Sequence, residues 1–173
     1  ITATHEALQT EITATNAFEI NDETGDVIKI TGNEPTNLVV NGDFNDGVGT
    51  WSNYFGTILS TISNKLNVSI ATANGTFRQE NSQQAGEYYA YLEYDTGVHS
   101  INSISIRTFL DNTQTNFYAM GNGLGVNKGS LSILNNFSSF NLLGFMITIG
   151  SSTDVNILID NIKLFNVSQM KLK

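Results

Sequence analysis

The chain has 173 residues, of which 40% are hydrophobic and only 14% are charged, and it has a net charge of −8 and no cysteine. That length suits one domain with a sizeable core plus a small appendage, and the lack of cysteine excludes disulfides and thiolate chemistry. The negative charge argues against a nucleic acid or an anionic membrane as partner. Because there is no apolar run of about 18 residues, we expect no membrane insertion. The chain begins with Ile1 rather than methionine, so we expect it to be a piece of a longer protein.

The amino-terminal segment contains a short heptad pattern. The a and d positions of this pattern have the spacings 4, 3, 4 and 3 and are Ile1, His5, Leu8, Ile12 and Thr15. Two heptads are too short to form a stable helix alone. Two interpretations remain open: an ordinary capping helix or loose terminus, or the end of an oligomeric stalk supported by neighbouring chains, for which we expect a homotrimer.

A hairpin pattern follows the heptads. Two short runs, residues 18–21 and 26–31, flank a turn in which Gly25 can adopt a positive φ. A lone hairpin is barely stable in water, so this one needs a partner surface. The turn residues 32–35 then mark a boundary. We therefore predict a stalk segment over residues 1–35 and a main domain over residues 36–173.

The main domain reads as short runs of alternating apolar residues separated by turn residues. This pattern predicts an all-β fold, a β-sandwich or jelly roll, because no segment between the runs has a convincing helical period. The predicted strands are residues 37–44, 57–62, 65–71, 76–80, 87–94, 101–110, 116–120, 130–134, 142–149 and 156–165. The glycine-rich run at 121–129 is interpreted as a flexible loop, since no helix follows it that could bind a phosphate.

Three motifs in the correct order resemble the jelly-roll carbohydrate-binding modules. The domain opens with NLVVNGDFNDGVGTW at 37–51, continues with GEYYAYLEYDTG at 86–97 and closes with FMITIGSSTDVNILIDNIKLFNV at 145–167. Thr50 stands where the family usually has the glycine before the tryptophan, and Asn45 where it often has glutamate. The resemblance covers about 130 residues and implies a sugar-binding jelly roll with Trp51 in its core.

Strand alternation selects candidate sugar-binding residues. In the run 87–94 two carboxylates share a face with Tyr89 and Tyr91, and carboxylates are seldom buried unpaired, so this face should be the outer one. Outward aromatic rings beside charged groups suit a sugar, whose C–H face packs on a ring while its hydroxyls form hydrogen bonds. The alternative is that these rings pack on a neighbouring subunit or a loop. The predicted sugar-binding residues are Tyr89, Tyr91, Glu93, Arg107 and Phe109.

The same resemblance implies a structural calcium ion. Carried over by motif, its ligands are Asp43, the backbone of Asn64 and Lys65, and the side chain of Asp160. Oxygen ligands from distant parts of the chain suit a hard cation. The alternative is that Asp160 caps a turn or pairs with Lys163.

Catalytic signals are lacking, because the two histidines lie in a predicted stalk and a polar turn and there is no nucleophile motif. We therefore expect a non-enzymatic protein, located extracellularly or on a virion surface. The favoured function is attachment to host glycans by a phage tail or head fibre. The alternatives are a carbohydrate-binding module of a secreted polysaccharide-degrading enzyme, or a purely structural jelly roll of a capsid or surface layer.

Overall fold

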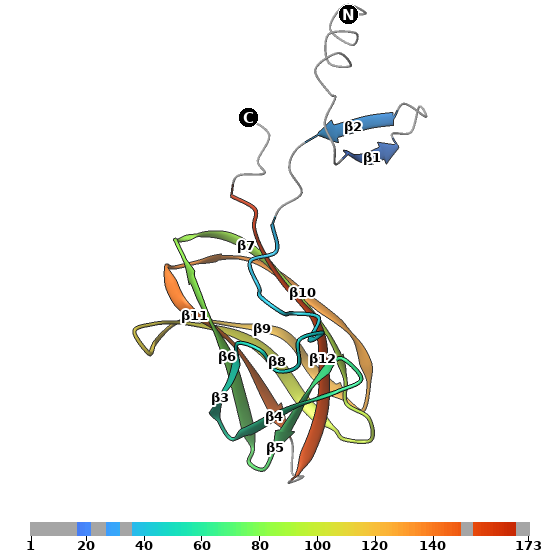
Figure 1. Ribbon diagram of the computed structural model, residues 1–173, viewed down its shortest axis with the longest axis vertical. Helices are drawn as coiled ribbons and strands as arrows, with labels where there is room; N and C mark the ends of the chain where they lie inside the picture. The colour runs from blue at the N-terminus through green and yellow to red at the C-terminus, as the bar shows by residue number, and fades with distance from the viewer. Residues whose placement is uncertain (1–16, 22–26, 32–35, 150–153, 169–173) are drawn as a thin grey trace, which may run out of the picture. The chain divides into compact units, whose positions relative to one another are not determined.

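The computed structural model describes residues 17–21, 27–31, 36–149 and 154–168. The chain divides between Thr36 and Asn37 into two units (Figure 1). Within the described residues no helix is long and apolar enough to cross a membrane. The predicted heptad helix lies outside the described residues. The strands are β1 (Ala17–Asn21), β2 (Val27–Thr31), β3 (Trp51–Phe55), β4 (Thr57–Ile62), β5 (Lys65–Ile70), β6 (Asn74–Gln83), β7 (Gly86–Asp95), β8 (Ile101–Leu110), β9 (Thr113–Gly125), β10 (Lys128–Phe137), β11 (Phe140–Ile149) and β12 (Val155–Asn166).

The first unit contains the predicted hairpin. Strands β1 and β2 pair antiparallel, with Ala17 opposite Thr31 and Asn21 opposite Val27. The predicted pairing of two strands is therefore confirmed, and the predicted turn between them lies outside the described residues.

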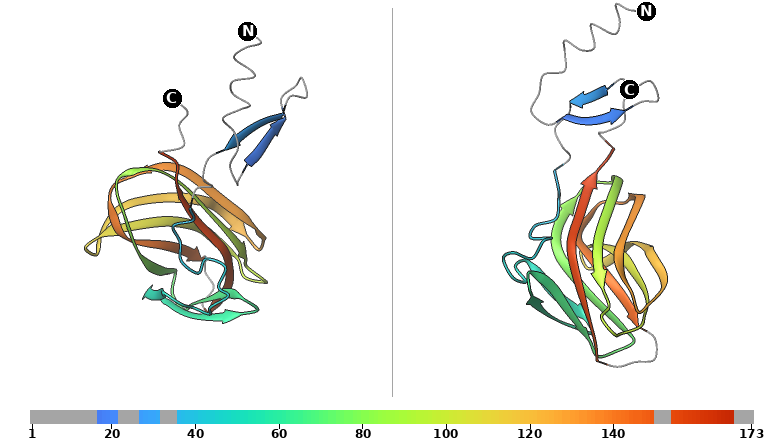
Figure 2. Two further views of the ribbon diagram at one scale, coloured as in Figure 1. Left: turned by 45° about the horizontal axis from the view of Figure 1, so that its top comes forward. Right: turned by 90° about the vertical axis from the view of Figure 1, so that its right-hand side faces the viewer.

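The second unit is a β-sandwich of two antiparallel sheets (Figures 1 and 2). The first sheet has the strand order β10-β7-β12-β5-β4, and the second sheet has the order β3-β6-β11-β8-β9. Each strand turns one set of alternate side chains toward the opposite sheet, which is the pattern that predicted a sandwich. The all-β fold class is confirmed.

The core between the sheets is built from these alternate apolar residues. On β7 the side chains of Tyr88, Ala90 and Leu92 are fully buried, while their neighbours along the strand face outward. Trp51 is 3% exposed, and its ring lies 5.5 Å from that of Phe77. The prediction that Trp51 belongs to the core is confirmed, and truncating a tryptophan so placed costs about 3 to 5 kcal/mol.

The opening motif is not a strand, so the prediction of a strand at 37–44 is wrong. Residues 36–50 form bends and turns, with Asn41 at φ 51° and Phe44 at φ 54°. The Asn41 side chain accepts a hydrogen bond from Asp46 N and donates one to Gly47 O. Side-chain hydrogen bonds therefore take the place of backbone pairing with a neighbouring strand in this segment. An apolar run was mistaken for a strand because side-chain hydrogen bonding of this kind leaves no periodic signal.

This opening segment lies against the closing strand. Leu38 N donates to Leu164 O at 2.8 Å, and Ile162 N donates to Gly42 O at 2.9 Å. A Cβ on Gly42 would lie 2.1 Å from Ile162 O, so only glycine fits there. The opening and closing motifs that carried the resemblance therefore pack on each other.

The glycine-rich run is mostly strand, so its interpretation as a flexible loop is wrong. Strand β9 continues through Gly125 and β10 starts at Lys128, which leaves two residues between them. A Cβ on Gly121 would lie 2.8 Å from Leu131 Cδ2, so the absence of a side chain lets Leu131 pack closely. Glycine marks close packing at this position rather than mobility.

Candidate functional site

The five predicted sugar-binding residues lie on two different sheets. Tyr89, Tyr91 and Glu93 belong to β7 of the first sheet, whereas Arg107 and Phe109 belong to β8 of the second. Combining them into one site is therefore wrong, because strands adjacent in sequence here join opposite layers of the sandwich. Each group remains a candidate on its own face.

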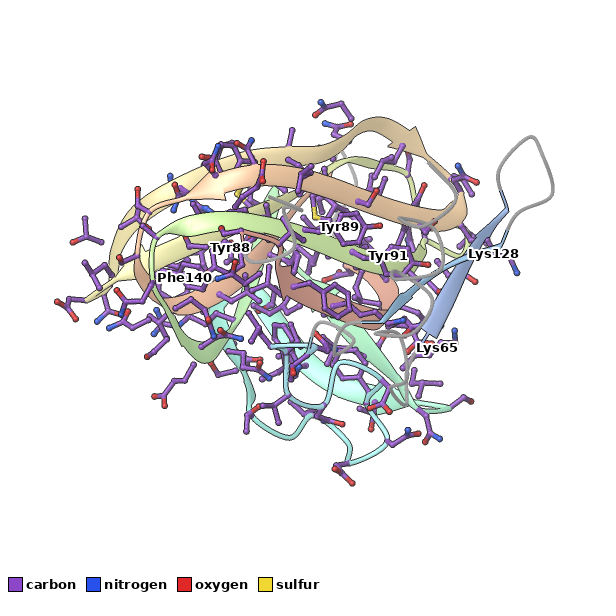
Figure 3. The ribbon with its side chains drawn as sticks, turned by 90° about the horizontal axis from the view of Figure 1, so that it is seen from above. Lys65, Tyr88, Tyr89, Tyr91, Lys128 and Phe140 are labelled. Carbon is purple, nitrogen blue, oxygen red and sulfur yellow. The ribbon has the colours of Figure 1, made fainter. Side chains whose placement is uncertain are left out.

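We call the outer surface of the first sheet the tyrosine face. Figure 3 shows Tyr89 and Tyr91 on this side of β7, while Tyr88 points to the interior near Phe140, with ring centroids 5.8 Å apart. The predicted alternation along β7 is thus confirmed. The face is formed by Lys65, Tyr89, Tyr91, Glu93, Lys128, Asp160, Lys163 and Phe165.

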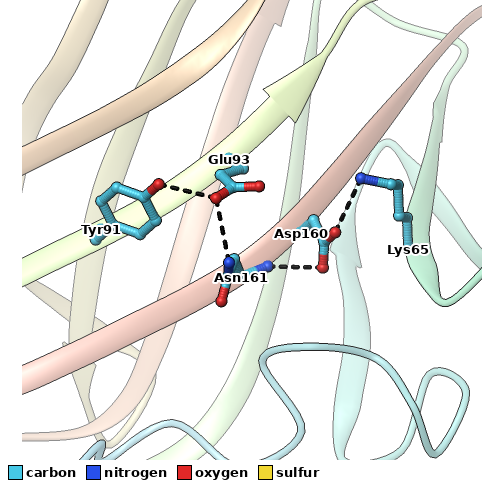
Figure 4. Close-up of polar contacts among 5 residues, drawn as sticks. All are labelled: Lys65, Tyr91, Glu93, Asp160 and Asn161. Carbon is cyan, nitrogen blue, oxygen red and sulfur yellow. Dashed lines mark hydrogen bonds and ion pairs between the residues drawn. The ribbon is translucent and has the colours of Figure 1, made fainter.

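The polar groups of the tyrosine face bond to one another (Figure 4). The Tyr91 hydroxyl donates to Glu93 Oε1 at 2.9 Å, and Asn161 Nδ2 donates to the same oxygen at 3.1 Å. Glu93 lies directly opposite Asp160 across the two strands, which places two negative charges side by side. Lys65 Nζ relieves this repulsion through an ion pair of 2.9 Å with Asp160 Oδ2.

The same contacts shift two pKa values upward. The hydrogen bond to Asp160 is the main cause that raises the pKa of Lys65, and the charges of Glu93 and Asp95 add to it. The hydrogen bond to Glu93 is the main cause that raises the pKa of the Tyr91 hydroxyl, with burial acting in the same direction. Both shifts favour the protonation states that hold this network together.

The aromatic rings of the tyrosine face have partners within the domain. Tyr89 stacks on Phe165 with ring centroids 6.4 Å apart, and Lys163 Nζ lies 5.7 Å from the centre of the Tyr91 ring. A hollow of 350 Å³ lies between Lys65, Tyr91 and Lys128. Of the charged residues that line this hollow, Lys65, Glu93 and Asp160 already take part in the contacts described above.

The predicted calcium ligand Asp160 already has partners for both of its oxygens. Asp160 Oδ2 accepts from Lys65, and Asp160 Oδ1 accepts from Asn161 N at 2.8 Å. The expected alternative partner, Lys163, is instead placed over the Tyr91 ring. The ammonium of Lys65 therefore occupies the position at Asp160 where a cation would bind.

The other predicted ligands lie on turns. Asp43 is exposed, and its carboxylate accepts a hydrogen bond from Asn45 at 2.6 Å. Asn64 sits in the β4–β5 turn with φ 57°. Among the residues that the structure describes, no three acidic or histidine side chains gather around one point. The predicted set has only two carboxylates beside backbone carbonyls, so calcium remains an expectation of the resemblance alone.

We call the outer surface of the second sheet the arginine face. Its central row of neighbouring residues runs across five strands from Ser52 through Arg78, Gly144 and Arg107 to Phe117. Tyr54, Phe55 and Phe117 are 43%, 58% and 45% exposed on it. A hollow of 480 Å³ is lined by Tyr54, Phe55, Arg107, Phe109, Asn112 and Gln114.

Arg107 is held between aromatic rings. Its guanidinium carbon lies 5.7 Å from the centre of the Phe109 ring and 5.4 Å from that of Phe117. Its Nε donates to Gln114 Oε1 at 2.7 Å, and an Nη donates to Thr76 Oγ1 at 3.5 Å. Burial lowers the pKa of this half-buried guanidinium. Its partners in the domain are thus neutral amides, hydroxyls and rings.

Tyr54 bridges the face. Its ring lies 4.2 Å from the Arg78 guanidinium and packs edge-on against Phe109 at 5.4 Å. Because Arg78 is on β6 and Phe109 on β8, the ring crosses β11 between them. Phe109 was predicted to point outward and does so, but Tyr54 and Arg107 cover it and leave it 3% exposed.

The sequence prediction missed most of this face. Tyr54 and Phe55 lie on β3, a strand that was not predicted because it follows directly on the opening turns. Arg78 and Gln114 gave no signal, since a single polar residue in a strand is usually only a solvated side chain. The available clue was a concentration of outward aromatic residues on the three strands β3, β8 and β9.

The sandwich is similar to solved carbohydrate-binding modules. A family 22 xylan-binding domain from Paenibacillus barcinonensis aligns with 80% of this chain and 99% of its own, at a TM-score of 0.60 and 8% identity. A family 16 carbohydrate-binding module aligns with 75% of this chain and 100% of its own, at 0.54 and 14%. The expected fold of such modules is therefore confirmed.

A phage protein shares the fold. The enzymatically active domain of tailspike protein 4 from bacteriophage CBA120 aligns with 75% of this chain and 21% of its own, at a TM-score of 0.51 and 14% identity. No family model matches the sequence, and no curated protein matches it. At these identities the likeness concerns the fold.

Proposed function

We propose that this chain is a non-catalytic, glycan-binding domain that binds sugar on the arginine face. The observation that supports this most is the placing of exposed Tyr54, Phe55 and Phe117 around the guanidinium groups of Arg78 and Arg107. Flat apolar rings bind the C–H face of a pyranose, and guanidinium and amide groups bind its hydroxyls. The fold likeness to carbohydrate-binding modules agrees with this proposal.

The arginine face is preferred over the tyrosine face because its groups remain available. The side-chain amides of Asn112 and Gln114 line the hollow and contact a single arginine each. On the tyrosine face, Glu93 receives two hydrogen bonds and Asp160 is paired. A sugar bound there would have to break contacts that the domain already makes.

Binding to a glycan array tests the choice of face. A Tyr54→Ala, Phe117→Ala double variant should lose binding by about fivefold to a hundredfold, since each stacked ring contributes about 0.5 to 1.5 kcal/mol. The matched control is the Tyr89→Ala, Tyr91→Ala double variant, which removes two aromatic rings from the opposite sheet and should bind normally. The reverse result would transfer the site to the tyrosine face, and an array with no bound glycan would contradict the proposed function.

We propose further that the domain acts outside the cell as part of a trimeric phage fibre. The heptad spacing of residues 1–15 supports an oligomeric stalk, and the tailspike likeness is consistent with a phage origin. Weak sugar sites gain strength from three linked copies. The second candidate is a binding module borne by a polysaccharide-degrading enzyme, which the likeness to a xylan-binding domain favours.

Light scattering on the full chain distinguishes these two settings. A fibre domain should have three times the mass of 18.9 kDa that one chain has. A monomer at micromolar concentration would favour the enzyme-borne module instead. Glycan binding itself is expected in both settings.

A further inference from the structure

We infer that the glycan bound by the arginine face carries a carboxylate, and that Arg107 binds it. This inference rests on the proposed function, because it names the class of sugar taken by the same site. The competing class of sugar is a neutral oligosaccharide, which would need only rings and amides.

Among the residues that the structure describes, Arg107 is a half-buried cation without an acidic partner. Within the described part of the chain, an ion pair joins Lys65 to Asp160 and none joins Arg107 to a carboxylate. This is notable in a chain with a net charge of −8, where acidic residues outnumber basic ones by 16 to 8. Removing a charge from water without an opposite charge is costly, and a bound anion offsets that cost.

Some N–H donors of the Arg107 guanidinium also have no acceptor among the described residues. A guanidinium has five N–H groups arranged in a planar fork. Gln114 and Thr76 accept from two of them, so among the described residues three N–H groups have no protein acceptor. A fork with free donors matches the two oxygens of a carboxylate, which it binds through paired hydrogen bonds.

The strands around Arg107 supply no competing carboxylate. Strands β3, β9 and β11 contain no charged residue at all. The acidic side chains nearest in the sheet are Glu80 on β6 and Asp111 in the β8–β9 turn, and both are exposed. Asp111 accepts a hydrogen bond from Asn141 at 3.0 Å, and Glu80 lies two residues from Arg78 on the same face. Arg107 therefore has no carboxylate on its own strand or on either strand paired with it.

Gly144 lies between the two arginines in the row across the sheet. Arg78 and Arg107 both lie opposite Gly144, on either side of it. Neighbouring strands are about 4.8 Å apart, so the two Cα atoms are separated by about 9.6 Å. Gly144 has no side chain there, and an added Cβ would lie 3.3 Å from Arg78 Cβ and 3.4 Å from the Phe109 ring. Arg78 and the Phe109 ring therefore lie close over Gly144, and the Tyr54 ring packs on both of them.

A sugar acid combines the features that this arrangement accepts. The ring of a uronic acid can stack on Tyr54 or Phe117 while its carboxylate, projecting from the ring edge, reaches Arg107. The amides of Asn112 and Gln114 remain for hydroxyl groups. A neutral sugar would satisfy the rings and amides but would leave the guanidinium charge unpaired.

Isothermal titration calorimetry with defined oligosaccharides tests the inference on the unmodified full chain. The probes are an oligogalacturonate, its methyl ester, a sulfated oligosaccharide of similar length and a neutral galactan oligomer, together with an array of sialylated and desialylated glycans. We expect binding of carboxylated sugars, a loss of about tenfold to a hundredfold on esterification or desialylation, and weaker binding at high salt. Equal affinity for the ester and the acid would overturn the inference while leaving glycan binding intact. Binding of sulfated sugars alone would also overturn it.

Two variants locate the effect at Arg107. Arg107→Lys keeps the charge but loses the planar fork, and should weaken binding of the acid about tenfold; Arg107→Gln should weaken it at least as much. Lys128→Gln is the control, because it removes one positive charge from the other sheet, and it should bind the acid like the parent chain. If Arg107→Gln fails to fold, the acid-to-ester comparison on the parent chain still decides. Failure of every probe, charged or neutral, would contradict the proposed function as well.

Discussion

The two outer faces of the sandwich accommodate charge in opposite ways. On the tyrosine face, Glu93 and Asp160 lie directly opposite each other, and their repulsion is relieved by Lys65, Tyr91 and Asn161. On the arginine face, Arg107 is surrounded by rings and amides and keeps unused donors among the described residues. A network whose members bond to one another adds rigidity but has little left for a ligand. Unused bonding capacity is therefore a better guide to a binding surface than the number of polar groups.

The largest expected difference between the faces concerns stability. Phe109→Ala should lower the free energy of unfolding by about 3 kcal/mol, because this ring, though on an outer face, is buried beneath Tyr54 and Arg107. Tyr89→Ala, on the tyrosine face, should cost about 1 kcal/mol, since its half-buried ring has one stacking partner. Urea unfolding followed by tryptophan fluorescence measures both. Equal losses would mean that Phe109 does not support the arginine face in this way.

A smaller difference should appear at alkaline pH. The folded state raises the pKa of Lys65 above 10.5 and that of Tyr91 above 10.0, so the stability from both groups is present below those values. It is lost as the pH rises through the higher folded-state pKa values. Because these groups are largely solvated, we expect the loss to be no more than about 1 kcal/mol.

Unfolding in urea at pH 8 and pH 11 measures this loss. An Asp160→Asn, Tyr91→Phe double variant should show a smaller fall in stability between the two pH values than the parent chain, since both interactions are removed. Arg107→Gln is the control from the other face and should keep the parent's pH dependence. The prediction fails if the double variant loses as much stability as the parent.

The smallest expected effect is that of a chelator. Since Lys65 already neutralises Asp160, excess EDTA should leave the Tm of the parent chain unchanged in calorimetry. A drop of several degrees, reversed by added calcium, would reinstate the calcium ion that the resemblance implies. It would also mean that Lys65 moves away from Asp160 when the ion binds.

Local patterns in the sequence predicted the strands and their faces well. The alternation along β7 placed Tyr88 inside and Tyr91 outside correctly, because two carboxylates on one side of a strand exclude that side from the core. The inference for β7 needs only the two-residue period of a strand. The place of Trp51 in the core was instead implied by the family resemblance, from its position directly after the opening turn.

The site itself depends on long-range pairing, which a single sequence does not reveal. Nothing in the residues themselves says that β7 and β8 join different sheets, so Tyr91 and Arg107 were wrongly placed together. Nor does the sequence show that Arg78 and Arg107 are brought to either side of Gly144, since they are 29 residues apart along the chain. The strand at 37–44 failed for a different reason, because side chains such as Gln79 bond its backbone in place of a neighbouring strand.

The packing of the opening turn on the closing strand has a topological consequence. Leu38 and Leu164 are joined by a hydrogen bond of 2.8 Å, so the sandwich begins and ends at the same place. A polypeptide that enters and leaves a domain at one point can carry it as a side branch, without changing the path of the segments before and after it. Such a domain can be exchanged for another. It can also be circularly permuted, with its two ends linked and new ends opened in the turn at Asp111 and Asn112, while its ten strands keep the same neighbours.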